Sequence, residues 1–154
     1  MDPLSIAASS AALVTLCAKI SKSLNKFICD GRGVDRALEA FRDEIDDLSG
    51  FLASIESSFR DNRTATAALR QTTGHEQSHW QKAQRGMNDC RGTLEKLSSV
   101  IERVRGDHGN GHAFFSRQRR QIRLDMNSTQ IVALRHQIQS YKDTMKLSFH
   151  VITM

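Results

Sequence analysis

Proline is almost absent from this chain, and glycine is sparse. The single proline is Pro3, so nothing downstream of it forbids long helices. Nine glycines and an aromatic content of only 6% also favour helices. No segment alternates apolar and polar residues in the two-residue period of a strand. A chain of 154 residues is long enough to bury a core, and we expect a single all-α domain over residues 1–154.

Cysteine is scarce as well, and its three copies cannot all pair with one another. A secretory signal peptide is not expected, because Asp2 stands where such peptides are basic and the first lysines follow the apolar run. We therefore expect reduced thiols in a cytosolic protein. Cys17 and Cys90 fall on apolar stripes and are expected in the core, whereas Cys29 ends the first helix.

Charge is missing from residues 3–18, although charged residues make up 25% of the chain. Asp2 and Pro3 form a helix start, because an aspartate accepts hydrogen bonds from free backbone N–H groups and proline tolerates the first helical position. We expect a helix over residues 3–28. Its apolar stripe contains Ile6, Leu13, Leu16, Ile20, Leu24 and Phe27.

This uncharged stretch is too short for an ordinary transmembrane anchor. As a helix it spans about 24 Å, whereas the hydrocarbon core of a bilayer is about 30 Å thick. A longer span to Ile28 includes Lys19, Lys22 and Lys26, which would have to reach the headgroups or face water. The first helix therefore suits either a bundle core or a conditional insertion into a membrane.

Apolar periodicity predicts the remaining helices. Residues 34–60 and 76–105 each carry a heptad pattern, and Gly31 and Gly33 supply a tight turn before the first of them. After a glycine-rich break at 106–111 we expect a short basic helix over 114–125 and a longer one over 128–151. The expected core seams contain Leu38, Phe41, Ile45, Leu48, Leu52, Ile55, Trp80, Met87, Leu94, Leu97, Ile101, Leu134 and Ile138. The predicted fold is an antiparallel bundle of four to five helices with a broken last helix.

Charge is also distributed unevenly, since residues 29–61 are acidic and residues 113–154 are basic. In a bundle, such asymmetry helps neighbouring helices select one another. A second interpretation is a basic surface for anionic lipid, beside Phe114 and Phe115, and nucleic acid is not expected as a partner. The densest basic cluster consists of Arg117, Arg119, Arg120 and Arg123.

Residues 75–79 match HExxH, the zinc-protease pattern in which two histidines one helical turn apart bind the metal. Here His75 directly follows Gly74, so the motif begins at a helix start rather than inside a helix. Lys82 replaces the glycine of the extended motif, and His108 would lie at the opposite end of the bundle, as would His112. We expect a solvated helix start for His75 and His79, with no catalytic residues, no metal and no cofactor.

The opening string Met1-Asp2-Pro3-Leu4-Ser5-Ile6-Ala7-Ala8-Ser9 resembles HeLo-like N-terminal domains of fungal STAND (NOD-like receptor) proteins. The order of the later segments is similar to that family's over the whole chain. The resemblance implies a non-enzymatic helical bundle, similar to the four-helix executioner domain of animal necroptosis. It also implies a membrane-targeting, cell-death-inducing effector, triggered by a receptor domain in cis or by an amyloid-signalling partner.

Carried onto this sequence, the resemblance makes the first helix the segment that enters the membrane. Glycine is absent before Gly31, so small alanines would replace the glycine zipper proposed for some relatives. The residues implicated in insertion are Leu4, Ile6, Ala8, Ala12, Leu13, Val14, Leu16 and Ile20. Those implicated in contact with anionic lipid are Lys19, Lys22, Lys26, Arg117, Arg119, Arg120 and Arg123.

We therefore expect a domain that is cytoplasmic at rest and that moves to the plasma membrane when it self-oligomerises. The alternative is a soluble helical interaction or oligomerisation module without membrane activity. A small metallohydrolase is a third hypothesis, which depends on the HExxH match alone.

Overall fold

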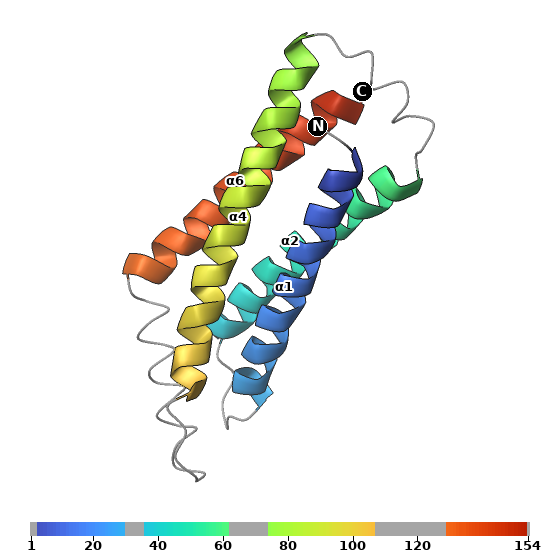
Figure 1. The fold of residues 1–154 in the computed structure, drawn as a ribbon. Helices are drawn as coiled ribbons and strands as arrows, with labels where there is room; N and C mark the ends of the chain where they lie inside the picture. The colour runs from blue at the N-terminus through green and yellow to red at the C-terminus, as the bar shows by residue number, and fades with distance from the viewer. Residues whose placement is uncertain (1–2, 30–35, 62–73, 107–128, 154) are drawn as a thin grey trace.

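The computed structural model describes residues 3–29, 36–61, 74–106 and 129–153, and each of these segments is a helix (Figure 1). They are α1 (Pro3–Cys29), α2 (Arg36–Asp61), α4 (Gly74–Gly106) and α6 (Thr129–Thr153). No strand occurs within these ranges. The prediction of an all-α bundle is confirmed, and all four helices begin and end within two residues of the expected positions.

The expected short helix over 114–125 lies outside the described residues, as do Phe114 and Phe115. The predicted break also lies outside the described residues, between α4, which ends at Gly106, and α6, which begins at Thr129.

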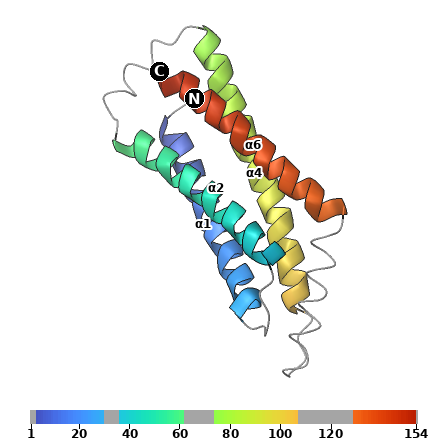
Figure 2. The same ribbon diagram turned by 180° about the vertical axis from the view of Figure 1, so that it is seen from behind.

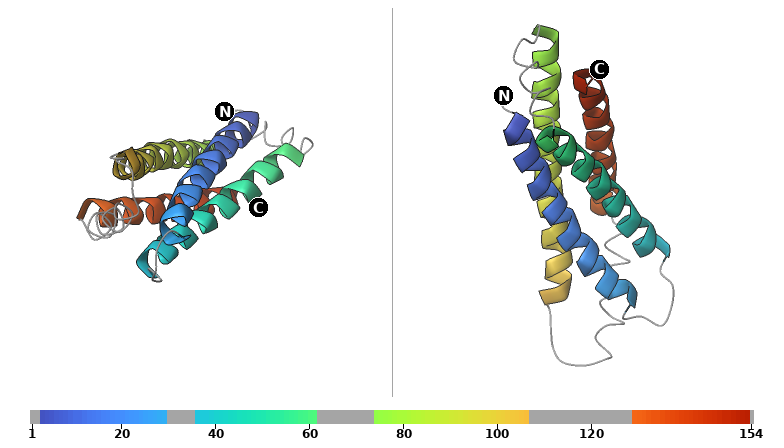
Figure 3. Two further views of the ribbon diagram at one scale, coloured as in Figure 1. Left: turned by 90° about the horizontal axis from the view of Figure 1, so that it is seen from below. Right: turned by 90° about the vertical axis from the view of Figure 1, so that its right-hand side faces the viewer.

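The helices form two antiparallel hairpins. Helix α1 packs along α2, and α4 packs along α6, while α1 contacts α4 over a shorter stretch. Both chain ends lie at one end of the bundle (Figure 1). From behind, α2 and α6 lie nearest the viewer (Figure 2), and the view from below shows the two hairpins side by side (Figure 3). Every helix therefore has an inner face toward the other three.

A single hydrophobic cluster joins the inner faces of the four helices. Every residue of the expected core seams belongs to it, and none is more than 6% exposed. Burial of this kind contributes about 25 cal/mol for each Å² of apolar surface removed from water, so these seams are the main stabilising feature of the fold.

Two local features show how the helices pack, one between the hairpins and one within the second hairpin. The ring of Phe59 on α2 lies 5.5 Å from that of Trp80 on α4 and 5.6 Å from that of Phe149 on α6, measured between centroids. Tilted aromatic pairs at this separation stabilise beyond their buried area. Within the second hairpin, Gly86 is buried against Met145, since a Cβ atom at Gly86 would meet Met145 Cγ at 3.1 Å. Glycine here lets α4 and α6 approach closely.

Candidate functional site

The candidate site begins with α1, the helix expected to insert into membranes. Its inner stripe is fully covered by the bundle: Ile6, Leu13 and Ile20 are at most 1% exposed. Val14 and Leu16 are partly buried at the margin of the core, and Ala8 and Ala12 are exposed. The side chain of Leu4 lies outside what the structure describes. The bundle therefore covers the inner stripe of α1 and leaves Ala8 and Ala12 on its outer face.

Helix α1 also buries a polar side chain that has no partner among the described residues. The side chain of Ser10 is 0% exposed, and its hydroxyl oxygen has no hydrogen-bond partner among the described residues. A buried hydroxyl without a partner costs about 1–3 kcal/mol. The docked position of α1 is therefore less stable than its apolar stripe alone would make it.

Polar contacts hold the C-terminal half of α1. The Ser21 hydroxyl donates a hydrogen bond of 2.6 Å to Asp46 of α2, and Arg42 of α2 donates one of 3.0 Å to the Asn25 side chain. Lys19 forms an ion pair of 2.9 Å with Glu102 of α4. Both partners of that ion pair are more than half exposed, and such pairs contribute at most about 1 kcal/mol.

Lys19, Lys22 and Lys26 are all exposed and follow one another at spacings of three and four residues along α1. Side chains at these spacings share one face of a helix. The structure therefore brings together the three lysines that we expected to contact lipid. The four arginines of the second basic cluster, residues 117, 119, 120 and 123, lie outside the described residues.

Two thiols lie where α1 faces α4: Cys17 belongs to α1 and Cys90 belongs to α4. Cys17 and Cys90 are both free and 0% exposed. Burial raises the pKa of each thiol to about 12, and at Cys17 the neighbouring Cys90 and Asp46 side chains add to the rise. Because the thiolate is the reactive form, both cysteines are inert while α1 is docked.

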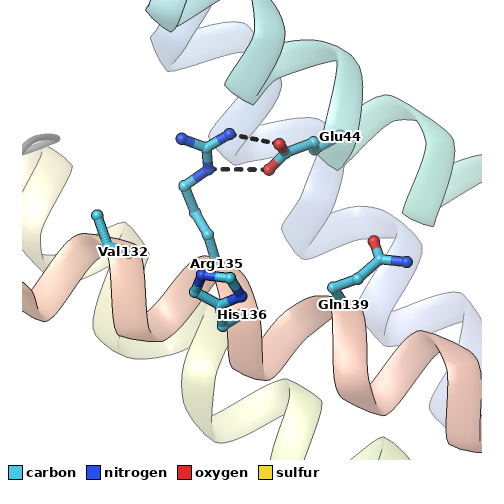
Figure 4. A pocket seen from close by; sticks show the side chains of 5 residues that line it. All are labelled: Glu44, Val132, Arg135, His136 and Gln139. Atoms are coloured by element: carbon cyan, nitrogen blue, oxygen red, sulfur yellow. Dashed lines mark hydrogen bonds and ion pairs between the residues drawn. The ribbon is translucent and has the colours of Figure 1, made fainter.

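Charged side chains join α2 to α6 in an arrangement that we call the α2–α6 charge seam, formed by Glu44, Asp47, Arg135 and Lys142. Arg135 donates two hydrogen bonds to Glu44, one of them from Nε at 3.0 Å (Figure 4), and Lys142 forms an ion pair with Asp47. Hydrogen bonding to Glu44 raises the pKa of Arg135. Burial, with help from the neighbouring Lys146 ammonium, lowers the pKa of Lys142.

Two cation–π contacts extend this charge seam. The guanidinium of Arg135 lies over the Phe41 ring at 5.6 Å from its centroid, and the Lys146 ammonium lies over the Phe51 ring at 5.7 Å. In both cases α6 supplies the cation and α2 supplies the ring. These contacts between acidic α2 and basic α6 are consistent with the interpretation that the uneven charge helps neighbouring helices select one another.

A surface pocket of about 300 Å³ opens beside this charge seam. Its lining includes Glu44 of α2 and, from α6, Val132, Arg135, His136 and Gln139 (Figure 4). The guanidinium is already occupied by Glu44, so the pocket has no unpaired strong charge with which to bind a ligand.

Only part of the HExxH match lies within the described residues. His79 is half-buried and its Nδ1 has no hydrogen-bond partner among the described residues, while the side chain of His75 lies outside them. His108 and His112 lie outside them too. Within the helices that the structure describes, no three His, Cys, Asp or Glu side chains come together as a metal site.

Among the described segments, no helix is both long enough and apolar enough to cross a bilayer. This result agrees with the short uncharged stretch of α1.

The sequence did not reveal three features of the site: the partnerless Ser10, the facing thiols and the residues of the α2–α6 charge seam. The acidic and basic regions were a signal for the last of these, but they did not identify which residues pair.

Comparison with known proteins gives one match. The family model described as "Pigment biosynthesis cluster protein PigL N-terminal" matches residues 1–154, the whole chain. Neither the curated proteins nor the solved structures contain a match.

Proposed function

The chain belongs to the family of PigL-type N-terminal domains of pigment biosynthesis cluster proteins, and on that premise we propose that it is a HeLo-like, non-enzymatic effector domain that disrupts membranes. In this proposal a regulatory receptor domain in cis, or an amyloid-signalling partner, brings copies together. Oligomerisation then releases α1 into the plasma membrane and causes cell death. The observation that carries the proposal is the uncharged N-terminal half of α1, whose large apolar residues are covered by the resting bundle.

The energetics of α1 support such a release. Its buried stripe would exchange a protein core for acyl chains, and both are apolar environments, so the difference in free energy can be a few kcal/mol. Exposure of the stripe to water instead would cost about 25 cal/mol per Å². The partnerless Ser10 hydroxyl lowers this cost of exposure to water, which supplies the hydrogen bonds that the bundle does not.

The lysines on α1 favour an anionic membrane as the destination. Each basic residue near an anionic surface contributes about 1 kcal/mol. Lys22→Gln with Lys26→Gln should therefore weaken binding to phosphatidylserine vesicles by roughly 30-fold, which co-sedimentation measures. The matched control neutralises two exposed lysines of α4, Lys82→Gln with Lys96→Gln. Equal losses from both pairs would show that only net charge matters, and not α1.

Insertion of α1 is tested by a charge on its outer face. Ala12 is exposed in the bundle, so Ala12→Asp leaves the resting fold intact but places a carboxylate in the inserted helix. An aspartate near the middle of a membrane helix costs about 2.5–3.5 kcal/mol, which lowers the insertion equilibrium roughly 60- to 300-fold. Release of a dye from phosphatidylserine vesicles, with the protein clustered on them, should fall accordingly.

Ala133→Asp is the control for this experiment, because Ala133 is also exposed but lies on α6. It should leave dye release unchanged. Dye release that survives Ala12→Asp, or that both substitutions abolish alike, contradicts insertion of α1.

The alternative function is a helical interaction module that never enters lipid. The three large apolar residues that the described helices expose, Val132, Leu147 and Val151, all lie on α6, and Leu147 is 65% exposed. Self-association without any vesicle leakage would favour this alternative.

A further inference from the structure

The helices pack more extensively within each hairpin than between the two hairpins. Within each hairpin the helices pack closely along their length. Between the hairpins, α1 contacts α4 over a shorter stretch, and α2 and α6 approach closely at few backbone positions. Long charged side chains span much of that second gap, through Arg135 with Glu44 and Lys142 with Asp47. The boundary between hairpins is therefore where the bundle divides most readily.

A separated hairpin cannot remain uncovered in water. Phe59 of α2 packs against Trp80 of α4 and Phe149 of α6, and all three side chains are 6% exposed in the bundle. Separation would expose these rings, and a fully buried phenylalanine contributes about 1.5–3 kcal/mol. Any opened molecule thus has a strong tendency to cover both inner faces again.

The fold itself shows what covers each face, because the other hairpin does so in the resting molecule. The match is specific as well as apolar, since acidic α2 meets basic α6 and two α6 cations lie over α2 rings. A second copy of this chain offers the same complementary surface. Opposite charges across an interface also suppress wrong pairings.

We propose that this protein self-associates by hairpin exchange, in which the α1–α2 hairpin of one copy packs on the α4–α6 hairpin of another. Each contact that joins the hairpins within one chain then forms between two chains. Domain swapping of this kind requires no new surface, and a high local concentration favours it over the monomer. The exchange supplies the self-association step of the proposed function, but it is tested in solution without lipid, so the two can fail separately.

Charge reversal across the α2–α6 charge seam distinguishes exchange from other association. Asp47→Lys places a lysine opposite Lys142, and Lys142→Glu places a glutamate opposite Asp47, so each variant alone has like charges between its own hairpins. In an exchanged pair made of one chain of each variant, both interfaces regain opposite charges. The mixture should form a two-chain complex at a dissociation constant about tenfold or more below that of either variant alone.

Native mass spectrometry of the mixture measures this, after brief mild denaturation to allow the hairpins to separate. The double variant carrying both substitutions restores the pair within one chain, and it should behave as the wild type. The Lys142 side chain is only 9% exposed, so a second pair controls for a folding defect of Lys142→Glu. Glu44→Arg with Arg135→Glu repeats the experiment at a basic side chain that is 29% exposed. Absence of a mixed complex in both pairs overturns the proposal.

A control pair places the reversed charges away from this charge seam. Asp89→Lys and Lys96→Glu both change exposed residues of α4. A mixed complex from these two variants would show general charge attraction and would also overturn the proposal.

The wild-type protein provides an independent measurement. Isotope-labelled and unlabelled chains are mixed, and a carbodiimide joins the Lys142 amine to the Asp47 carboxylate where they form their ion pair. In the dimer fraction, exchange predicts cross-linked peptides that contain one labelled and one unlabelled partner. Cross-links only between peptides of the same isotope contradict it.

Discussion

Leu13→Ala tests whether α1 can leave the bundle by itself. Leu13 is 1% exposed and lies on the same buried stripe as Cys17. Truncation of a buried leucine to alanine costs about 2–5 kcal/mol, through lost transfer free energy and the cavity that remains. If only the docked form loses that stabilisation, the equilibrium for release of α1 rises between about 30-fold and about 4,000-fold.

The assay is the rate at which a maleimide labels the thiols beneath α1. Cys29→Ser removes the third cysteine, so that labelling reports Cys17 and Cys90 alone. Both are 0% exposed with a pKa of about 12, so the docked form does not react at neutral pH. The labelling rate therefore follows the population in which α1 has left the bundle, and Leu13→Ala should raise it by the factor above.

Two other leucines on α6 supply the controls. Leu147 is 65% exposed, so Leu147→Ala should leave the rate unchanged. Leu134 is 6% exposed and lies on α6, so Leu134→Ala lowers the free energy of global unfolding without changing α1 itself. Equal acceleration by Leu13→Ala and Leu134→Ala would refute release of α1 as a separate step, because the thiols would then react only from the unfolded chain.

Three further predictions concern stability. The pKa of Cys17 and of Cys90 is about 12 in the fold and 9.0 ordinarily, so the stability that each neutral thiol contributes is full below pH 9 and is lost as pH rises toward 12. Between these values the free energy of unfolding should fall by about 1.4 kcal/mol per pH unit for each thiol. Alanine at either position should remove that thiol's part of the pH dependence, which denaturant titrations measure. Gly92→Ala, with open space around it, should stabilise α4 by up to about 1 kcal/mol, whereas Gly86→Ala should be less stable than Gly92→Ala by about 1–3 kcal/mol, because its Cβ crowds Met145; thermal unfolding compares them. Ser10→Ala should stabilise the fold by about 1–3 kcal/mol and slow maleimide labelling, and a loss of stability would contradict the absence of a partner for its hydroxyl.

The sequence alone determined the helices and their inner faces. A heptad spacing such as that from Leu38 to Ile55 leaves one stripe of a helix to bury, and each of those residues is buried. Because no proline follows Pro3, the later helices can run without interruption. The glycines that interrupt the apolar pattern indicate where helices end. These are local properties, because periodicity and chain breakers act within one segment.

Only the tertiary structure decided which residue meets which across helices. The sequence showed that α2 is acidic and α6 basic, but not that Arg135 reaches Glu44 rather than another carboxylate. Nor did it show that Ser10 lacks a partner or that Cys17 lies near Cys90. Apolar periodicity specifies the face that a helix buries, whereas the partner on that face depends on the crossing angle and register, which arise only when all four helices pack together.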